Sequence, residues 1–165
     1  MRSRIGVLVV LLVAGASMIG RSQGPSLEGA WRVTEVVVTG ANASTNKTPQ
    51  PGLYIFTKKH YSVVAVGGTS PRKEFGAAKD PANLTDAEKM ARYEAWNQFT
   101  ANAGTYEVKG NTLTTRPTVA KNPSVMGGEG QTREFKMDGK TLTLIQKPAA
   151  GQPASETRTV LTRVE

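Results

Sequence analysis

The chain has 165 residues, a formal net charge of +8, no cysteine and an aromatic content of 6%. Its length suffices for one domain with a hydrophobic core, and without cysteine it lacks the disulfides that small secreted domains of eukaryotes usually carry. The 21 basic residues are scattered rather than clustered with aromatic side chains, which argues against a nucleic-acid-binding protein.

The N-terminal 22 residues are predicted to be a secretory signal peptide. Two arginines precede the apolar run 5–16, which ends in the Ala-x-Ala pattern of a cleavage site. We expect cleavage after Ala16, or alternatively after Ser22. The run is shorter than the roughly 20 apolar residues of a spanning helix, so we expect no transmembrane segment in the mature chain. Export without disulfides favours a periplasmic or secreted bacterial protein.

Eight β-strands are predicted in the rest of the chain, from runs that alternate apolar and polar residues between turn signals. They cover residues 31–39, 52–57, 61–66, 104–109, 112–119, 133–137, 140–146 and 156–164. Asp138-Gly139 has the sequence of a tight hairpin turn. Eight strands joined mostly by short turns are typical of an all-β, antiparallel up-and-down barrel, which is just wide enough for side chains or one small ligand.

One α-helix is predicted between the third and fourth of these strands. Thr85 and Glu88 have the spacing of a capping box, and the helix is expected to run from Ala87 to about Ala101. Two alanines and Phe99 lie at intervals of four residues and would form an apolar stripe along the helix, with Trp96 beside them. We expect this stripe to pack on a sheet or to cap the mouth of the barrel.

Several short motifs carry a family resemblance. They are Leu-Glu-Gly-Ala-Trp at 27–31, Tyr-Ile-Phe-Thr and Tyr-Ser-Val within 54–63, Gly-Thr-Tyr-Glu-Val at 104–108, and Arg-Glu-Phe, Asp-Gly and Leu-Thr-Leu within 133–144. With them, the chain from 27 to 165 resembles the bacterial lipocalin-like domain family, a calycin-type barrel. The resemblance implies one domain in which Trp31 lies at the closed end and an arginine near the last strand packs across it. Arg163 is the best-placed match, and Arg158 is the second.

Arg133 is the leading candidate for contact with a ligand. It shares a predicted strand face with Phe135 and Met137, because the three residues are spaced by two. If this face lines the barrel, the guanidinium could hold a carboxylate or phosphate head group with two hydrogen bonds. The alternatives are an internal ion pair, for example with Glu35, or exposure near the strand end.

The candidate ligand-binding set also contains Phe135, Glu35, Tyr61 and Tyr106. Simple alternation from Trp31 turns Glu35 into the barrel, where a carboxylate needs a partner, whereas a strand bulge would turn it to solvent. The two tyrosines suit a cavity, because a buried hydroxyl needs a polar partner.

No catalytic residue, metal site or cofactor is predicted. His60 is the single histidine, it lies in an expected turn, and without cysteine it gives no ordinary zinc-ligand set. The glycine-rich segment 122–130 is interpreted either as a gate at the open end or as a simple flexible connection.

We therefore expect an exported, monomeric, non-enzymatic barrel that binds a small hydrophobic or anionic amphipathic ligand, which the sequence does not identify. One alternative is a barrel enzyme of the isomerase, cyclase or hydratase type, which would need Glu35, Tyr106 and Arg133 to converge. The other is a structural envelope domain with a filled core.

Overall fold

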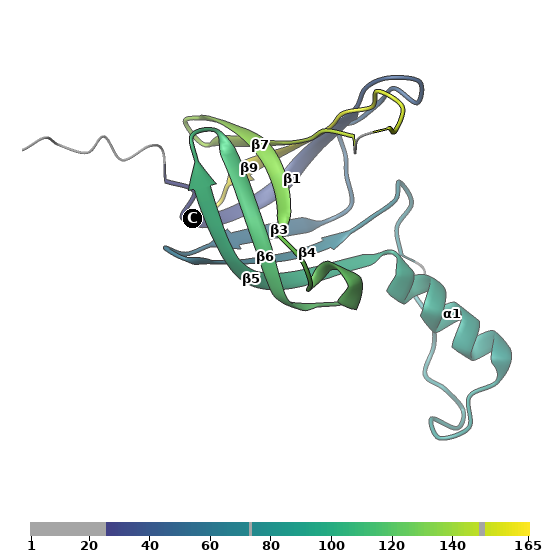
Figure 1. Ribbon diagram of the computed structural model, residues 1–165. Coiled ribbons are helices and arrows are strands. Elements are labelled where there is room, and N and C mark those ends of the chain that lie inside the picture. Colours follow the sequence, from purple (N-terminus) through teal and green to yellow (C-terminus); the bar gives the residue numbers. More distant parts are fainter. Residues whose placement is uncertain (1–25, 73, 149–150) are drawn as a thin grey trace, which may run out of the picture.

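The computed structural model describes residues 26–72, 74–148 and 151–165, which form a closed antiparallel β-barrel (Figure 1). The elements in chain order are β1 (Gly29–Val38), β2 (Ser44–Asn46), β3 (Gly52–Phe56), β4 (His60–Val66), α1 (Asp86–Asn97), β5 (Phe99–Lys109), β6 (Thr112–Ala120), the 3₁₀ helix η1 (Pro123–Val125), β7 (Gln131–Asp138), β8 (Thr141–Gln146) and β9 (Thr157–Arg163). The predicted signal peptide, residues 1–22, lies outside the described residues.

Eight strands close the barrel, as the sequence predicts. From β3 to β9 each strand pairs with the next, β3 also pairs with the start of β1, and β9 pairs with β1 along most of its length. The ninth strand, β2, has three residues and pairs only with the far end of β1, over Val36–Val38. It is a short addition beside the barrel that the sequence did not predict. No helix within the described residues is both long and apolar enough to cross a membrane.

The core fills the end of the barrel at which β1 begins. Its fully buried side chains come from four strands and are Trp31, Leu113, Leu142 and Leu161. Around them pack the buried aromatic and aliphatic residues Phe56, Tyr61, Val63, Phe135 and Leu144. The Trp31 indole N–H donates a hydrogen bond of 2.8 Å to the carbonyl of Leu27, so its polar atom is satisfied inside the core.

A β-bulge in β1 reverses the expected direction of Glu35. The register of β1 against β9 slips between Val33 and Glu35, because β1 holds an extra residue there. After the slip Glu35 pairs with Val160, whose side chain points away from the face that carries the buried Leu161. Glu35 therefore faces outward, and Val36 takes the inward position. The inward orientation expected from simple alternation is wrong, and the alternative of a bulge holds.

The helix α1 begins as predicted but ends earlier. Thr85 and Glu88 form both hydrogen bonds of the capping box. The helix ends at Asn97, and Phe99, which the sequence placed on its apolar stripe, opens β5 and pairs with Val66 of β4. Pairing with a neighbouring strand has overridden the helical periodicity at this point, since propensity is a weak determinant against tertiary contacts.

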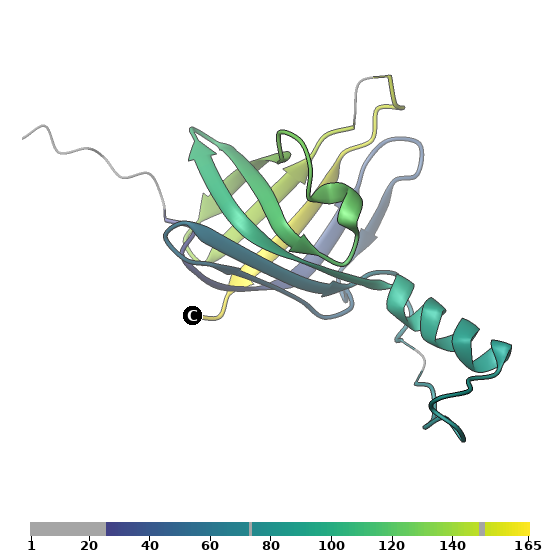
Figure 2. The same ribbon diagram turned by 60° about the horizontal axis from the view of Figure 1, so that its bottom comes forward.

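The position of α1 also differs from the expectation. Figures 1 and 2 show α1 projecting away from the barrel rather than lying across its mouth. Ala95 is its one buried residue, and Trp96 is exposed. The predicted cap over the mouth is therefore wrong. Residues Ala91 and Ala95 of α1 lie beside Phe75 of the preceding loop instead of the barrel core.

Gly104 gives a stability prediction for the barrel wall. It lies on β5 at a register slip against β6, and a β-carbon added there would lie 2.0 Å from the backbone oxygen of Arg116. Because a backbone atom cannot move aside as a side chain does, Gly104→Ala is expected to cost about 1–3 kcal/mol of unfolding free energy. Gly127→Ala is the matched control, since nothing lies within 4 Å of its added β-carbon. Equal urea midpoints for both variants would contradict the prediction.

Candidate functional site

The closed end of the barrel is sealed by Trp31 and Arg163, on strands that are neighbours in the closed sheet. The guanidinium carbon of Arg163 lies 4.2 Å from the centre of the Trp31 ring. Its Nη1 donates to the carbonyl oxygen of Glu28, and its Nη2 donates to that of Ser26 at 3.1 Å. The arginine thus ties the segment before β1 across the end of the barrel. The second candidate for this role, Arg158, instead pairs with Glu156.

Tyr106 also belongs to the closed end. Its ring meets Phe56 edge-on, with 5.2 Å between the ring centres. Its hydroxyl donates a hydrogen bond of 2.7 Å to the carbonyl of Thr57, in the turn after β3. Burial, and then the negative charge of Glu28, raise the pKa of this phenol. Tyr106 therefore holds a turn in place, and its hydroxyl is already engaged.

At the other, open end, Arg133 points into the barrel. Arg133 pairs with the buried Leu113 of β6, and alternation along β7 places it on the same face as Phe135, which is buried in the core, and Met137, which packs against it. Its Nε donates a hydrogen bond of 3.2 Å to Oε1 of Gln146. None of the five ion pairs among the described residues includes Arg133. The alternative of an ion pair with Glu35 is not realised, since the bulge turns Glu35 outward.

The positive charge of Arg133 affects the pKa of two nearby tyrosines. Tyr61 donates a hydrogen bond of 2.7 Å from its hydroxyl to Oδ1 of Asn102 on β5. Burial raises the pKa of Tyr61 and of Tyr54, and the positive charge of Arg133 opposes the rise in both. Both phenols keep their proton at neutral pH, as phenols ordinarily do, and that of Tyr61 is already donated to Asn102. The sequence analysis missed Tyr54, although its spacing of two from Phe56 marks it as facing inward.

Three pockets lie at this end, one of them on the outer side, where Arg133 meets Glu134 and Lys147; the other two reach inward-facing residues. The first of these two, of about 340 Å³, lies against β1, β3, β4 and β9; it includes Val33, Val36, Tyr54, Ala65 and Thr159. The other, of about 600 Å³, lies against β5, β6 and β7; it includes Asn102, Gln131 and Arg133 together with residues of η1 and α1. Asn122, Pro123 and Val125 line the second pocket, so part of the segment 122–130 does lie at the open end. Its role as a gate stays a prediction.

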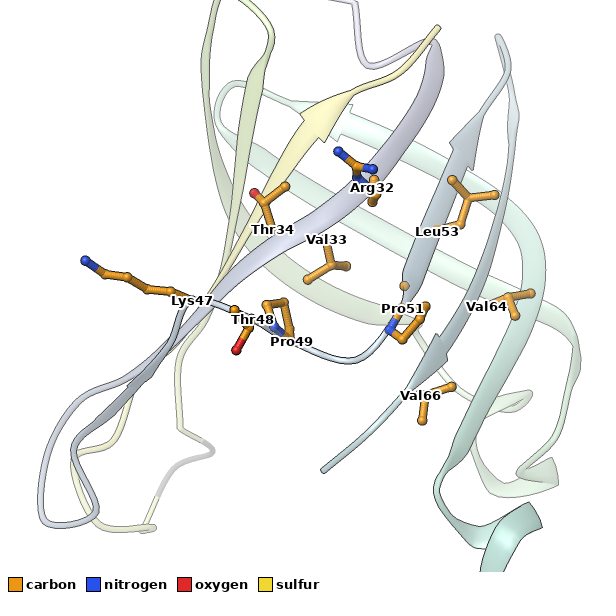
Figure 3. A pocket seen from close by; sticks show the side chains of 11 residues that line it. Arg32, Val33, Thr34, Lys47, Thr48, Pro49, Pro51, Leu53, Val64 and Val66 are labelled. Atoms are coloured by element: carbon orange, nitrogen blue, oxygen red, sulfur yellow. The ribbon is translucent and has the colours of Figure 1, made fainter. Parts of the chain in front are cut away.

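A fourth pocket, of about 690 Å³, lies outside the barrel where β1 and β3 diverge (Figure 3). The apolar side chains of Pro49, Leu53 and Val64 and the stems of Arg32 and Lys47 surround it. Figure 3 shows Lys47 directed away from the pocket centre. The open end, with its inward guanidinium and tyrosines, is the stronger candidate.

A family model described as a lipocalin-like domain matches residues 28–164, which include all the strands of the barrel. The chain belongs to the lipocalin-like domain family. Among solved structures, it is similar to an uncharacterized protein from Bacteroides eggerthii DSM 20697, known from a crystal structure at 2.60 Å resolution. The two share 11% identity with a TM-score of 0.44, over 84% of this chain and 99% of that chain. A comparison with curated proteins found no match.

In this lipocalin-like domain the three groups required by the enzyme hypothesis do not converge. Glu35 faces outward from β1, Tyr106 lies at the closed end, and Arg133 lies at the open end. His60 is exposed at the start of β4. Among the described residues no three His, Asp or Glu side chains cluster in a way that could hold a metal ion. The candidate site is therefore a pocket in which side-chain amides lie beside Arg133, with Lys121 at its outer part.

Proposed function

We propose that this lipocalin-like domain binds a small anionic amphipathic molecule at the open end of its barrel, with the head group held by Arg133. The observation that carries the proposal is the inward guanidinium of Arg133, which forms no ion pair within the described part of the chain. Its Nε donates to Gln146, and among the described residues its terminal N–H groups form no hydrogen bond to the protein. A carboxylate or phosphate matches the geometry of such a fork.

The surroundings of Arg133 support an anion over a neutral ligand. The Tyr54 hydroxyl is a further donor near Arg133, whereas that of Tyr61 already donates to Asn102. The chain stays positively charged without Arg2 and Arg4 of the predicted signal peptide, which adds a long-range attraction for anions. The apolar part of the ligand would lie along the larger pocket of the open end, which Arg133 lines together with the apolar side chains of Phe99 and Val125.

The protein would act after export as a monomeric carrier or sensor that catalyses no reaction. The predicted signal peptide supports export, since Arg2 and Arg4 precede a short apolar run and a small-residue cleavage pattern. The separation of Glu35, Tyr106 and Arg133 in space favours binding over the enzyme alternative, which needs them together.

Fluorescence titration of the mature protein tests this function. cis-Parinaric acid, an anionic polyene fatty acid, is expected to bind with one saturable site, and tetradecanoate is expected to displace it. The methyl ester of tetradecanoic acid should compete at least tenfold more weakly, because it has lost the charge that the guanidinium recognises. Absence of saturable binding, or equal competition by acid and ester, would contradict the proposal.

A further inference from the structure

The larger pocket of the open end continues beyond the barrel onto α1. Its lining begins with the inward residues Asn102, Gln131 and Arg133 and ends with side chains of α1 and of the start of β5. Figures 1 and 2 show why: α1 projects from the end of the barrel at which β5 begins, next to η1. One pocket of about 600 Å³ thus joins a cation inside the barrel to a surface outside it.

The outer part of this pocket is aromatic. Tyr93 and Trp96 on α1 and Phe99 on β5 line it, and we call these three residues the aromatic shelf. Trp96 and Phe99 pack with their ring centres 6.0 Å apart. The exposed fractions of Tyr93 and Trp96 are nevertheless 61% and 56%. An amphipathic helix normally turns such side chains to the core, so their exposure beside a pocket marks a surface that can bind an apolar group.

The shelf is fixed relative to the barrel. The ammonium of Lys121, just after β6, donates hydrogen bonds to the last carbonyls of α1, those of Trp96 and Asn97, the latter at 3.1 Å. The same ammonium lies 5.7 Å from the centre of the Trp96 ring. The backbone N–H of Gly67 adds a bond of 2.7 Å to the carbonyl of Gln98. The cation at the helix C-terminus also matches the helix dipole.

We propose that the ligand is longer than the barrel interior and that its apolar chain leaves the open end and lies on the aromatic shelf. This inference rests on the proposed function, because Arg133 sets where the head group is bound. It specifies the ligand class further, as a long-chain amphipathic anion held in a site that stays partly open. Chain length is then recognised by α1, outside the barrel, and the head group is recognised inside it.

A chain-length series with paired variants tests the inference. Octanoate and tetradecanoate are titrated calorimetrically into the mature wild-type protein, Trp96→Ala and Met90→Ala. Burial of one methylene is worth about fourfold in affinity. Trp96→Ala is expected to weaken tetradecanoate at least fivefold and octanoate less than twofold. Met90 is the matched control, because it is also 56% exposed on α1 but does not line the pocket; Met90→Ala should change neither affinity.

Tryptophan fluorescence gives a second readout. The chain has two tryptophans, and Trp31 is fully buried at the closed end. A shift of the emission on addition of tetradecanoate should therefore come from Trp96 and should vanish in Trp96→Ala. An equal effect of Trp96→Ala on both chain lengths, or none on either, would overturn the inference. Failure of the head-group proposal gives a different pattern, in which Arg133→Met leaves both affinities unchanged while Trp96→Ala still discriminates between the chains.

Discussion

Replacement of Trp31 by alanine is expected to lower the free energy of unfolding by about 3–5 kcal/mol, the usual cost of removing a buried aromatic side chain. Trp31 is fully buried, donates a hydrogen bond to Leu27 and lies under the guanidinium of Arg163. Since a domain is stable by about 5–15 kcal/mol in total, the loss would be a large fraction of the whole. Urea unfolding followed by far-ultraviolet circular dichroism measures it.

Arg163 is expected to contribute less, about 1–2 kcal/mol, through its contact with the Trp31 ring. Arg158→Ala is the control, because Arg158 lies on the same strand but forms only an exposed pair with Glu156, and such pairs contribute little. We therefore expect Arg158→Ala to be the most stable of the three variants, Arg163→Ala to be less stable, and Trp31→Ala to be the least stable. A Trp31→Ala variant within 1 kcal/mol of wild type, or equal losses for the two arginines, would mean that the seal of the closed end is misassigned.

Replacement of Arg133 by methionine is expected to weaken the binding of tetradecanoate by about 10- to 100-fold, the range for loss of hydrogen bonds to a charged group. Binding of the uncharged methyl ester should change less than twofold, since the methionine keeps an apolar side chain of similar length. The selectivity for acid over ester should therefore disappear. Displacement of a neutral fluorescent probe measures both affinities on the same scale.

The stability of the ligand-free variant separates binding from structure. Loss of one partner of a buried ion pair typically costs about 3–5 kcal/mol, because the other charge is left unpaired. Arg133 has no such partner among the described residues, so Arg133→Met should be as stable as wild type or more stable. Lys147→Met controls for net charge: Lys147 lies near the same end but pairs with Glu134 on the outer face. A stability loss with unchanged acid selectivity would assign Arg133 to the core.

Most of the fold could be predicted from the sequence because period-two alternation is a local signal. Phe135 and Met137 repeat every second residue on β7, and the Asp138-Gly139 turn fixes the pairing with β8. Alternation gave the wrong orientation for Glu35, because β1 holds one extra residue just before it. The bulge before Glu35 cannot be recognised from the alternation of β1, because this strand carries apolar residues on both of its faces.

The site was harder to predict because it depends on contacts between distant segments. Tyr106 and Tyr61 have the same local sequence pattern, but their hydroxyl groups have different partners. The hydroxyl of Tyr106 donates to the carbonyl of Thr57, 49 residues earlier in the chain, whereas that of Tyr61 donates to Asn102 toward the open end of the barrel. Likewise, helical spacing placed Phe99 on the apolar stripe of α1, but in the structure Phe99 pairs with β4 and begins the strand β5. The sequence placed Arg133 on one strand face with Phe135 and Met137 but left open whether that face lines the barrel. Its orientation and its lack of an ion-pair partner in the described chain required the structure.

The most direct test of a head-group site at Arg133 is a crystal structure of the mature protein with tetradecanoate. We expect the carboxylate at about 2.7–2.9 Å from the guanidinium nitrogens of Arg133, the range of charge-assisted hydrogen bonds. The alkyl chain should leave the open end over Trp96. A carboxylate bound elsewhere, for example beside Arg32 in the outer pocket between β1 and β3 (Figure 3), would contradict the account.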